Sequence, residues 1–446
     1  MRQKNLWHPR NIVVIGHVDA GKSTLMGRLL YELGRVDEKT KRANERGSSK
    51  VGKSSFSWAW GLDGTTEERE RGITMDIAQQ YFTTPHRQIT VLDAPGHKDF
   101  VPNMISGASQ ADCAVLVVDA GIGQFEAGFE RGGQTREHVI LVRSLGVSQV
   151  IVAVNKLDQV DWSRARFEEI ESSLRLFLGQ SGFSGSKITF VPVGATLGVN
   201  LVGREGEESK ELDEWYSGPT LVDCLDKLEP PLRDYTNLFR LPISNIFKMQ
   251  SMSGVFVAGR IASGIVQAGE KVRAMPGDDS VIGSVKSIEV EDESVNWAMA
   301  GMNVAIALAN IDPVNLNIGS VLCFPGEAVA LTTVFTARII VFDIAIPITP
   351  GASVELFNQS RDVPATISKL LSLMDRSTGK ASRKNPRVLS KGASAEVEIS
   401  LRGTDNNVPS KGIPLEQFAA NKDMGRILLR RNGETIAAGI VLEILK

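Results

Sequence analysis

The sequence predicts an α/β domain followed by two antiparallel β-barrel domains, and three observations lead to this fold class. Short runs of Val and Ile alternate with helical stretches from Asn11 to about Lys227. Pro230 and Pro231 then end the last helical stretch. Beyond them, short apolar runs separated by glycines replace the helical stretches. Strands that alternate with helices are typical of a parallel sheet covered by helices, whereas many short strands with turn residues are typical of barrels.

Five apolar runs in the first half are candidate strands. They are continuous rather than alternating, as expected for parallel strands that helices cover on both faces; they are Ile12–Ile15, Ile89–Leu92, Cys113–Val118, Val150–Val154 and Ile188–Val193. We expect Thr220–Leu228 to form the last helix of this doubly wound domain, because the two prolines that follow cannot continue a helix.

The segment after the prolines carries the glycine spacing of a small antiparallel barrel. The glycines that predict its turns are Gly254, Gly259, Gly264 and Gly269, and they separate short apolar runs such as Val255–Val257. This pattern predicts a first barrel.

A second set of strand signals begins at about Val334. Phe335–Phe342 is strand-like, and residues 395–401 alternate apolar with polar side chains as a half-buried strand does. Asn432-Gly433 lies between two apolar runs and predicts a hairpin, because both residues tolerate positive φ. We therefore predict domains at residues 1–230, 231–330 and 331–446, with an exposed loop at Asp375–Pro386.

Composition excludes several classes of protein. The 446 residues include 50 Lys and Arg against 52 Asp and Glu, a net charge of −2, so a uniformly basic nucleic-acid sleeve and an acidic disordered tail are excluded. The three cysteines are too few and too widely spaced for a disulfide framework, which favours a reducing, cytoplasmic location. No apolar run has the length of a signal peptide or membrane span, so we expect no membrane association.

Residues Gly16–Ser23 fit the P-loop pattern G-x-x-x-x-G-K-[ST]. In such a loop backbone amides surround phosphates, the lysine reaches the β and γ oxygens, and the hydroxyl is a ligand of Mg²⁺. The alternative is a glycine-rich turn that only caps a helix, and the strand before and helix after this segment disfavour it. We therefore predict nucleotide contacts from Asp19, Ala20, Gly21, Lys22, Ser23 and Thr24.

The choice of base is predicted from Asn155, Lys156 and Asp158, which follow the fourth candidate strand. Ligands of open α/β sheets bind at the carboxyl ends of the strands. The Asp158 carboxylate can accept from the ring N–H and the 2-amino group of guanine, whereas adenine has neither donor there. The sequence therefore favours GTP and GDP over ATP, although N-K-x-D is a short pattern whose weight depends on its position.

Asp93-Ala94-Pro95-Gly96-His97 follows the second candidate strand and predicts a switch. Asp93 can hold Mg²⁺ through water, and the Gly96 amide can bond a γ-phosphate and lose that bond when the phosphate leaves. His97 is placed to position the hydrolytic water. An isolated histidine is more often a surface or core residue, but its place after this motif favours the catalytic role.

A second switch is predicted at Arg69–Thr74. Thr74 follows a charged segment and can supply a further Mg²⁺ ligand, ordering the segment only when the triphosphate is bound. An ordinary charged helix end explains the local sequence equally well.

The complete set of motifs resembles the translational GTPases, in particular the group of elongation factor one alpha, eukaryotic release factor three and the HBS-type ribosome-rescue factors that partner Pelota. The resemblance extends over essentially the whole chain, and the HBS-type likeness is strongest at His17–Lys22, Ser55–Trp60 and Gly72–Ala78. It implies a P-loop GTPase domain followed by the two barrels.

The resemblance also implies roles for single residues. Val18 and Ile73 would form an apolar gate beside His97, and hydrolysis would be slow until a ribosome stimulates it. One position departs from the family, since Gly194-Ala195 replaces Ser-Ala or Ser-Gly in the last motif that contacts the base. We expect the Ala195 amide to reach guanine O6 and the missing hydroxyl to weaken guanine binding by about 1 kcal/mol.

We therefore expect a Mg²⁺-dependent GTPase that delivers Pelota to the A site of stalled ribosomes, contacts ribosomal RNA, acts in ribosome rescue and no-go mRNA decay, and is monomeric on its own. The alternatives are an aminoacyl-tRNA carrier like elongation factor one alpha and a termination GTPase like release factor three. A module that binds GTP without turnover is disfavoured by the combination of Lys22, Thr74, Asp93 and His97.

Overall fold

The computed structural model divides the chain into two compact units, 1–231 and 232–446. It describes residues 10–36, 39–41, 58, 78–130, 133–248, 254–278, 281–291, 293–375, 378, 380–402 and 412–446. The predicted residues Ile73 and Thr74 lie outside these ranges.

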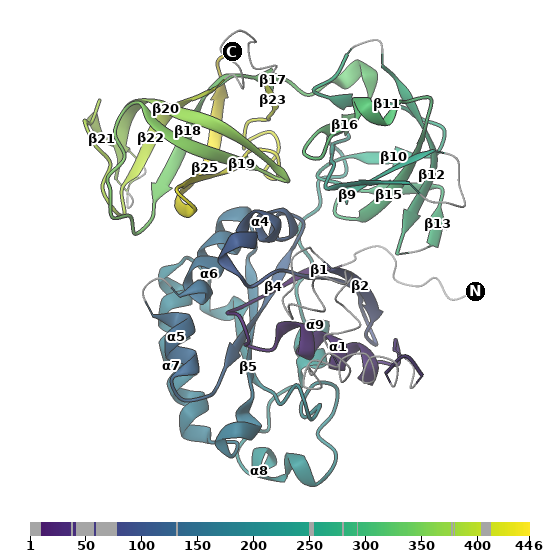
Figure 1. The fold of residues 1–446 in the computed structure, drawn as a ribbon, viewed down its shortest axis with the longest axis vertical. Helices are drawn as coiled ribbons and strands as arrows, with labels where there is room; N and C mark the ends of the chain where they lie inside the picture. Colours follow the sequence, from purple (N-terminus) through teal and green to yellow (C-terminus); the bar gives the residue numbers. More distant parts are fainter. Residues whose placement is uncertain are drawn as a thin grey trace. The chain divides into compact units, whose positions relative to one another are not determined.

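The first unit is built on a six-stranded sheet with the order β2-β3-β1-β4-β5-β6. All neighbouring pairs are parallel except β2 with β3. The strands are β1 (Arg10–Ile15), β2 (Ala78–Thr83), β3 (Gln88–Asp93), β4 (Cys113–Asp119), β5 (Gln149–Asn155) and β6 (Ile188–Pro192). Figure 1 shows the sheet between helices, so the predicted doubly wound architecture is confirmed.

Helices cover both faces of this sheet. The described α-helices are α1 (Lys22–Glu32), α4 (Val101–Ser109), α5 (Gln124–Phe129), α6 (Gln134–Leu145), α7 (Arg164–Gln180), α8 (Lys210–Asp213) and α9 (Leu221–Asp226). Helix α9 begins where Thr220 accepts a hydrogen bond from the Asp223 amide, and it lies within the helix predicted there.

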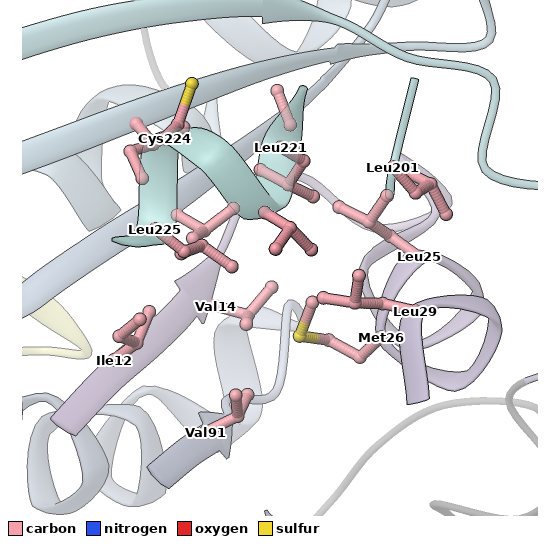
Figure 2. Packing of buried hydrophobic residues seen from close by; sticks show 14 of the residues in the cluster. Ile12, Val14, Leu25, Met26, Leu29, Val91, Leu201, Leu221, Cys224 and Leu225 are labelled. Atoms are coloured by element: carbon pink, nitrogen blue, oxygen red, sulfur yellow. The ribbon is translucent and has the colours of Figure 1, made fainter. Parts of the chain in front are cut away.

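The core beneath the P-loop helix ties the site to the sheet. Side chains of α1 and α9 face strands β1 and β3 in Figure 2, and Leu25, Leu29 and Val14 are fully buried in this cluster. Burying a Leu side chain stabilises a fold by about 1.5–3 kcal/mol. Helix α1 is therefore held firmly at the end of β1.

Strand β2 was not expected from the sequence. Its residues, AQQYFT, contain few consecutive apolar side chains, and only Phe82 is buried. It lies at the edge of the sheet and pairs antiparallel with β3. An edge strand needs no continuous apolar run, so the criterion for buried parallel strands could not find it.

The second unit contains two antiparallel barrel domains. The first has the strand path β7-β16-β11-β12-β15-β9-β8, with β13 beside β12 and a separate pair β10-β14. Its strands are β7 (Leu241–Pro242), β8 (Asn245–Phe247), β9 (Val255–Arg260), β10 (Ile265–Gln267), β11 (Lys271–Met275), β12 (Gly283–Val290), β13 (Glu293–Val295), β14 (Trp297–Met299), β15 (Asn303–Ala309) and β16 (Val321–Cys323).

In the last domain, pairing between β19 and β20 closes the path β19-β24-β25-β18-β22-β20, and β21 extends it. Strands β17 and β23 form a separate two-stranded sheet. The strands are β17 (Leu331–Thr332), β18 (Val334–Val341), β19 (Ala352–Asn358), β20 (Arg361–Met374), β21 (Ala381–Lys384), β22 (Ser394–Leu401), β23 (Ile413–Pro414), β24 (Arg426–Arg431) and β25 (Glu434–Ile444).

The predicted hairpin is confirmed, with Asn432 and Gly433 at φ 54° and 77°. Two expectations for these domains were wrong. Gly259 lies inside β9 rather than in a turn. A Cβ atom at this position would stand 2.1 Å from the Pro242 carbonyl oxygen. The segment expected to be a loop contains β21, whose four residues are all exposed. Among the residues described, no helix is long and apolar enough to cross a membrane.

Candidate nucleotide site

The P-loop joins β1 to α1, as its pattern predicts. Strand β1 ends at Ile15 and α1 begins at Lys22, directly after Gly21. The unpaired amides at a helix N-terminus and the helix dipole favour a phosphate there. The structure therefore places the predicted phosphate-binding residues at the start of a helix whose apolar face is buried.

Lys22 is held in place by the P-loop itself. Its Nζ atom donates to the carbonyl oxygens of Gly16 (3.1 Å) and His17 (2.8 Å), and the side chain is only 7% exposed. Burial lowers the pKa of Lys22 from 10.5 to about 8, against the opposing charges of Asp93 and Asp19. A buried ammonium with few compensating charges is suited to bind an anion.

Ser23 and Asp93 come together from different elements. The Ser23 hydroxyl, at the start of α1, donates to Asp93 Oδ2 (2.7 Å) at the end of β3. A hydroxyl and a carboxylate are the oxygen ligands that Mg²⁺ takes beside phosphate groups. Within the described part of the chain no cluster of three His, Cys, Asp or Glu side chains could hold a metal by itself. The pair thus fits Mg²⁺ that binds together with nucleotide phosphates.

Gly96 lies against the P-loop lysine. A Cβ atom at this position would stand 2.3 Å from Lys22 Nζ and 3.3 Å from the Gly16 carbonyl oxygen. No side chain fits there unless Lys22 moves. The close approach brings the predicted switch next to the Lys22 ammonium.

His97 follows at the surface of the same loop. The Asp99 amide donates to His97 Nδ1 (3.3 Å), and the imidazole is 44% exposed. Asp99 Oδ2 also lies 3.4 Å from His97 Nδ1, so both contacts of this nitrogen are within its own loop.

Asn155 links two loops at the carboxyl end of β5. Its Nδ2 donates to the Ala20 carbonyl (2.9 Å), and its Oδ1 accepts from the Ala195 amide (3.0 Å). The structure thereby brings Ala20, Asn155 and Ala195 together from three predicted motifs. Because the Ala195 amide already donates to Asn155 here, its contact with guanine O6 stays a prediction.

Lys156 and Asp158 follow Asn155 directly after the end of β5. Lys156 Nζ donates to the Asp19 carbonyl and to Asp119 Oδ2, both at 2.7 Å. Burial is the largest cause that raises the pKa of Asp158. A partly desolvated carboxylate gains from a ligand that offers two N–H groups.

Sequence reasoning missed three residues that support this site. Gln134 Oε1 accepts from the Val18 amide (3.2 Å) and so holds the predicted gate residue from helix α6. Arg166 donates to the Ala120 and Gly121 carbonyls and to Glu126, which fixes the loop after β4. His138 is buried, and burial and the charge of Lys22 lower its pKa to about 3, so it is neutral.

No local signal marks Gln134, Arg166 or His138 as part of the site. Each lies on a helix at an ordinary inward position, and the distance along the chain from Val18 to Gln134 is 116 residues. Residue spacing cannot predict a contact between two positions that lie so far apart in the sequence. Only the fold brings these side chains to the P-loop.

Replacing Gly96 by Ala tests whether the switch loop and Lys22 meet as described. We expect about tenfold weaker binding of a nonhydrolysable GTP analogue and a smaller change for GDP, because the methyl displaces the ammonium at the γ-phosphate side. Titration with fluorescent nucleotides measures both. Gly203→Ala is the control, since a Cβ atom there meets nothing within 4 Å. Equal losses for both nucleotides would contradict this prediction.

Comparison with family models covers most of the chain. Residues 8–231 match the elongation factor Tu GTP binding domain, residues 254–323 match elongation factor Tu domain 2, and residues 334–442 match the GTP-eEF1A C-terminal domain-like family. The order of the three matches is the order of the three domains described above.

Curated proteins and solved structures agree with these matches. Protein HBS1 of Drosophila melanogaster is 45% identical over 97% of this chain, which spans 63% of that protein. Elongation factor 1-alpha of Ignicoccus hospitalis is 40% identical over 97% of this chain and 96% of its own length. The GTP-bound structure of the S. cerevisiae Ski7 GTPase-like domain superposes with a TM-score of 0.78 at 20% identity, covering 97% of each chain, which shows the shared fold.

Proposed function

Because the chain belongs to the elongation factor Tu and elongation factor 1-alpha family of translational GTPases, we propose that it delivers a Pelota-type protein to the empty A site of stalled ribosomes. The chain is a GTPase that converts GTP and water to GDP and phosphate. The observation that supports a Pelota-type protein as the cargo is the chain's 45% identity with protein HBS1 over 97% of its length. The proposed place of action is the cytoplasm, in ribosome rescue and no-go mRNA decay, with a monomeric free protein.

In the proposed site, the P-loop binds the triphosphate and Asp158 binds the base. Backbone amides from Asp19 to Thr24 and the Lys22 ammonium surround the phosphates. Ser23, Asp93 and, from the other switch, Thr74 would hold Mg²⁺, which neutralises charge on the β- and γ-phosphates. Asn155 keeps the P-loop and the Gly194-Ala195 loop together, as its two hydrogen bonds allow.

The proposed switch depends on a bond that exists only with the triphosphate. The Gly96 amide bonds the γ-phosphate, and loss of that phosphate removes the bond, so the loop is biased toward a different conformation. The His97 imidazole orients the attacking water, beside the gate formed by Val18 and Ile73. Contact with ribosomal RNA completes this arrangement, which keeps GTP intact until the cargo is on the ribosome.

The main alternative is an aminoacyl-tRNA carrier. The 40% identity with elongation factor 1-alpha, which this chain matches over 96% of that protein's length, favours it as second candidate. A termination GTPase like release factor three shares the same domains and is the third. These functions differ in cargo and share the nucleotide site, so nucleotide binding alone does not separate them.

A cargo experiment separates these functions. The chain is immobilised with a nonhydrolysable GTP analogue or with GDP and incubated with purified Pelota, charged tRNA or release factor one. We expect Pelota to be retained, and retained more tightly with the GTP analogue than with GDP. Preference for charged tRNA would contradict the rescue function and favour the elongation-type carrier.

Replacing Asp158 by Asn tests the choice of base. An amide presents an N–H donor where the carboxylate accepted, so we expect GDP binding to fall by about 100-fold or more and xanthosine diphosphate binding to rise, since xanthine has a carbonyl at position 2. Calorimetry with both nucleotides measures the exchange. Asp362→Asn, at an exposed position of β20 in the last domain, is the control and should leave the preference for GDP unchanged.

A further inference from the structure

We infer that Trp162 and Gly194 form a matched pair in the guanine site, in which the indole occupies the space of a side chain at position 194 and excludes water from Asp158. The inference rests on the proposed role of Asp158 as the carboxylate that binds the base. It makes Trp162 a positioning residue that raises discrimination for the 2-amino group of guanine.

The geometry around Gly194 joins these residues. A Cβ atom at position 194 would stand 3.0 Å from Trp162 Cη2, 3.2 Å from Trp162 Cζ2 and 3.3 Å from Asp158 Oδ1. The ring edge and the carboxylate therefore border the same small space. Trp162 is only 5% exposed, so its ring is enclosed by protein and has little room to move away.

The backbone that carries Trp162 is held in an unusual conformation. Asp161 and Trp162 both have positive φ, at 51° and 47°, a region that bulky residues rarely adopt. Such a conformation persists only where surrounding contacts determine it. Here the Trp162 amide donates to the Leu157 carbonyl (2.9 Å), and the Trp162 carbonyl accepts from Trp215 Nε1 (2.8 Å).

These contacts hold the indole beside the space at Gly194 that Asp158 also borders. The 3-10 turn at Leu157–Val160 carries the carboxylate, and the two residues with positive φ bend the chain back directly after it. Trp215, which supports the bend, packs against Phe167 with ring centroids 5.4 Å apart. The same turn thus fixes both the Asp158 carboxylate and the ring that borders the same space.

Exclusion of water changes how strongly the carboxylate discriminates between bases. In a less polar surrounding, each hydrogen bond from guanine to Asp158 is stronger, and an acceptor left without its donor is more costly. Burial raises the pKa of Asp158, the direction expected for a carboxylate with reduced contact with water. Hypoxanthine lacks only the 2-amino group, so inosine diphosphate reports this contact directly.

The missing hydroxyl at position 194 therefore has a steric reason. A Ser at this position would place its Cβ at contact distances that an enclosed indole and a carboxylate can relieve only by shifting. The substitution Gly194→Ser is expected to disturb the base site while Trp162 is present. It should be tolerated when the ring is replaced by a smaller side chain.

The test measures GDP and inosine diphosphate affinities by calorimetry for the full chain and for Trp162→Leu, Trp162→Phe, Gly194→Ser and the double variant Trp162→Leu/Gly194→Ser. We expect Trp162→Leu to lower the ratio of GDP to inosine diphosphate affinity by about tenfold, and Trp162→Phe by less. Gly194→Ser should weaken GDP binding by about tenfold in the parent and by less than about twofold in the Trp162→Leu background. Trp297→Leu, in strand β14 of the second unit, is the control.

Two outcomes would overturn the inference: an unchanged nucleotide ratio in both Trp162 variants, or an equal loss from Gly194→Ser in both backgrounds. The ratio distinguishes the proposed role from general support of the fold, because a merely destabilised domain loses both nucleotides in parallel. A wrong assignment of Asp158 as the base-binding residue would be recognised by a separate measurement. If Asp158→Asn leaves the parent's preference for GDP unchanged, the base assignment itself is wrong.

Discussion

Replacing Lys22 by Met is expected to weaken GTP binding by about 100-fold or more, because the variant loses charge-assisted hydrogen bonds worth about 3 kcal/mol at the phosphates. The methionine keeps much of the apolar stem, so packing of α1 against the sheet is retained. Titration with a fluorescent GTP analogue measures the loss. Lys210→Met is the control, since that lysine is 67% exposed and paired with Glu207.

The same substitution should stabilise the nucleotide-free protein. The Lys22 pKa is lowered from 10.5 to about 8, so at neutral pH the folded chain holds an ammonium whose burial opposes folding by an amount on the order of 3 kcal/mol. This penalty disappears as the pH rises from about 8 to 10.5, where the folded state has released the proton and the unfolded state still holds it. We expect a higher thermal midpoint for Lys22→Met at pH 7 and a smaller difference at pH 10.

Bound phosphates should reverse this shift of the Lys22 pKa. Opposite charge favours the ammonium, so GTP binding above pH 8 takes up a proton and the affinity falls as the pH rises through that range. The pH dependence should be absent from Lys22→Met. An equal slope in parent and variant would assign the proton to another group and contradict the role of Lys22.

Replacing His97 by Ala is expected to lower ribosome-stimulated GTP hydrolysis by about 100-fold or more while GTP affinity stays within about twofold. The imidazole is 44% exposed and bonds within its own loop, so its removal does not open the P-loop. Single-turnover hydrolysis on ribosomes, with the nucleotide bound in advance, separates the chemical step from binding.

Two further variants, His86→Ala and His97→Gln, test whether the loss of hydrolysis is specific to the His97 imidazole. His86→Ala removes a histidine that is 77% exposed and 3.8 Å from Asp226, on the turn between β2 and β3, and should leave hydrolysis unchanged. His97→Gln keeps a hydrogen-bonding side chain without a titratable group and should retain more activity than Ala if a hydrogen bond from this position orients the water. Equal rates for the parent and His97→Ala would remove His97 from the mechanism.

Much of the fold was predictable because its signals are local. The five parallel strands are continuous apolar runs, and buried strands such as β5, whose seven residues are all buried, produce that pattern whatever surrounds them. The hairpin at Asn432-Gly433 was predictable for a related reason, since positive φ at two adjacent residues restricts the choice of amino acid. Strand β2 was missed because an edge strand has no such requirement.

The site divides in the same way. The amino-acid sequence by itself determined the P-loop, the two motifs after β3 and β5, and the preference for guanine, because each depends on residue types at fixed spacing beside a strand end. The tertiary structure alone decided that Gln134 holds Val18, that Asn155 joins Ala20 to Ala195, and that Trp162 fills the space beside Gly194. These are contacts between distant segments, and packing selects them by volume and hydrogen-bond geometry, which no local spacing encodes.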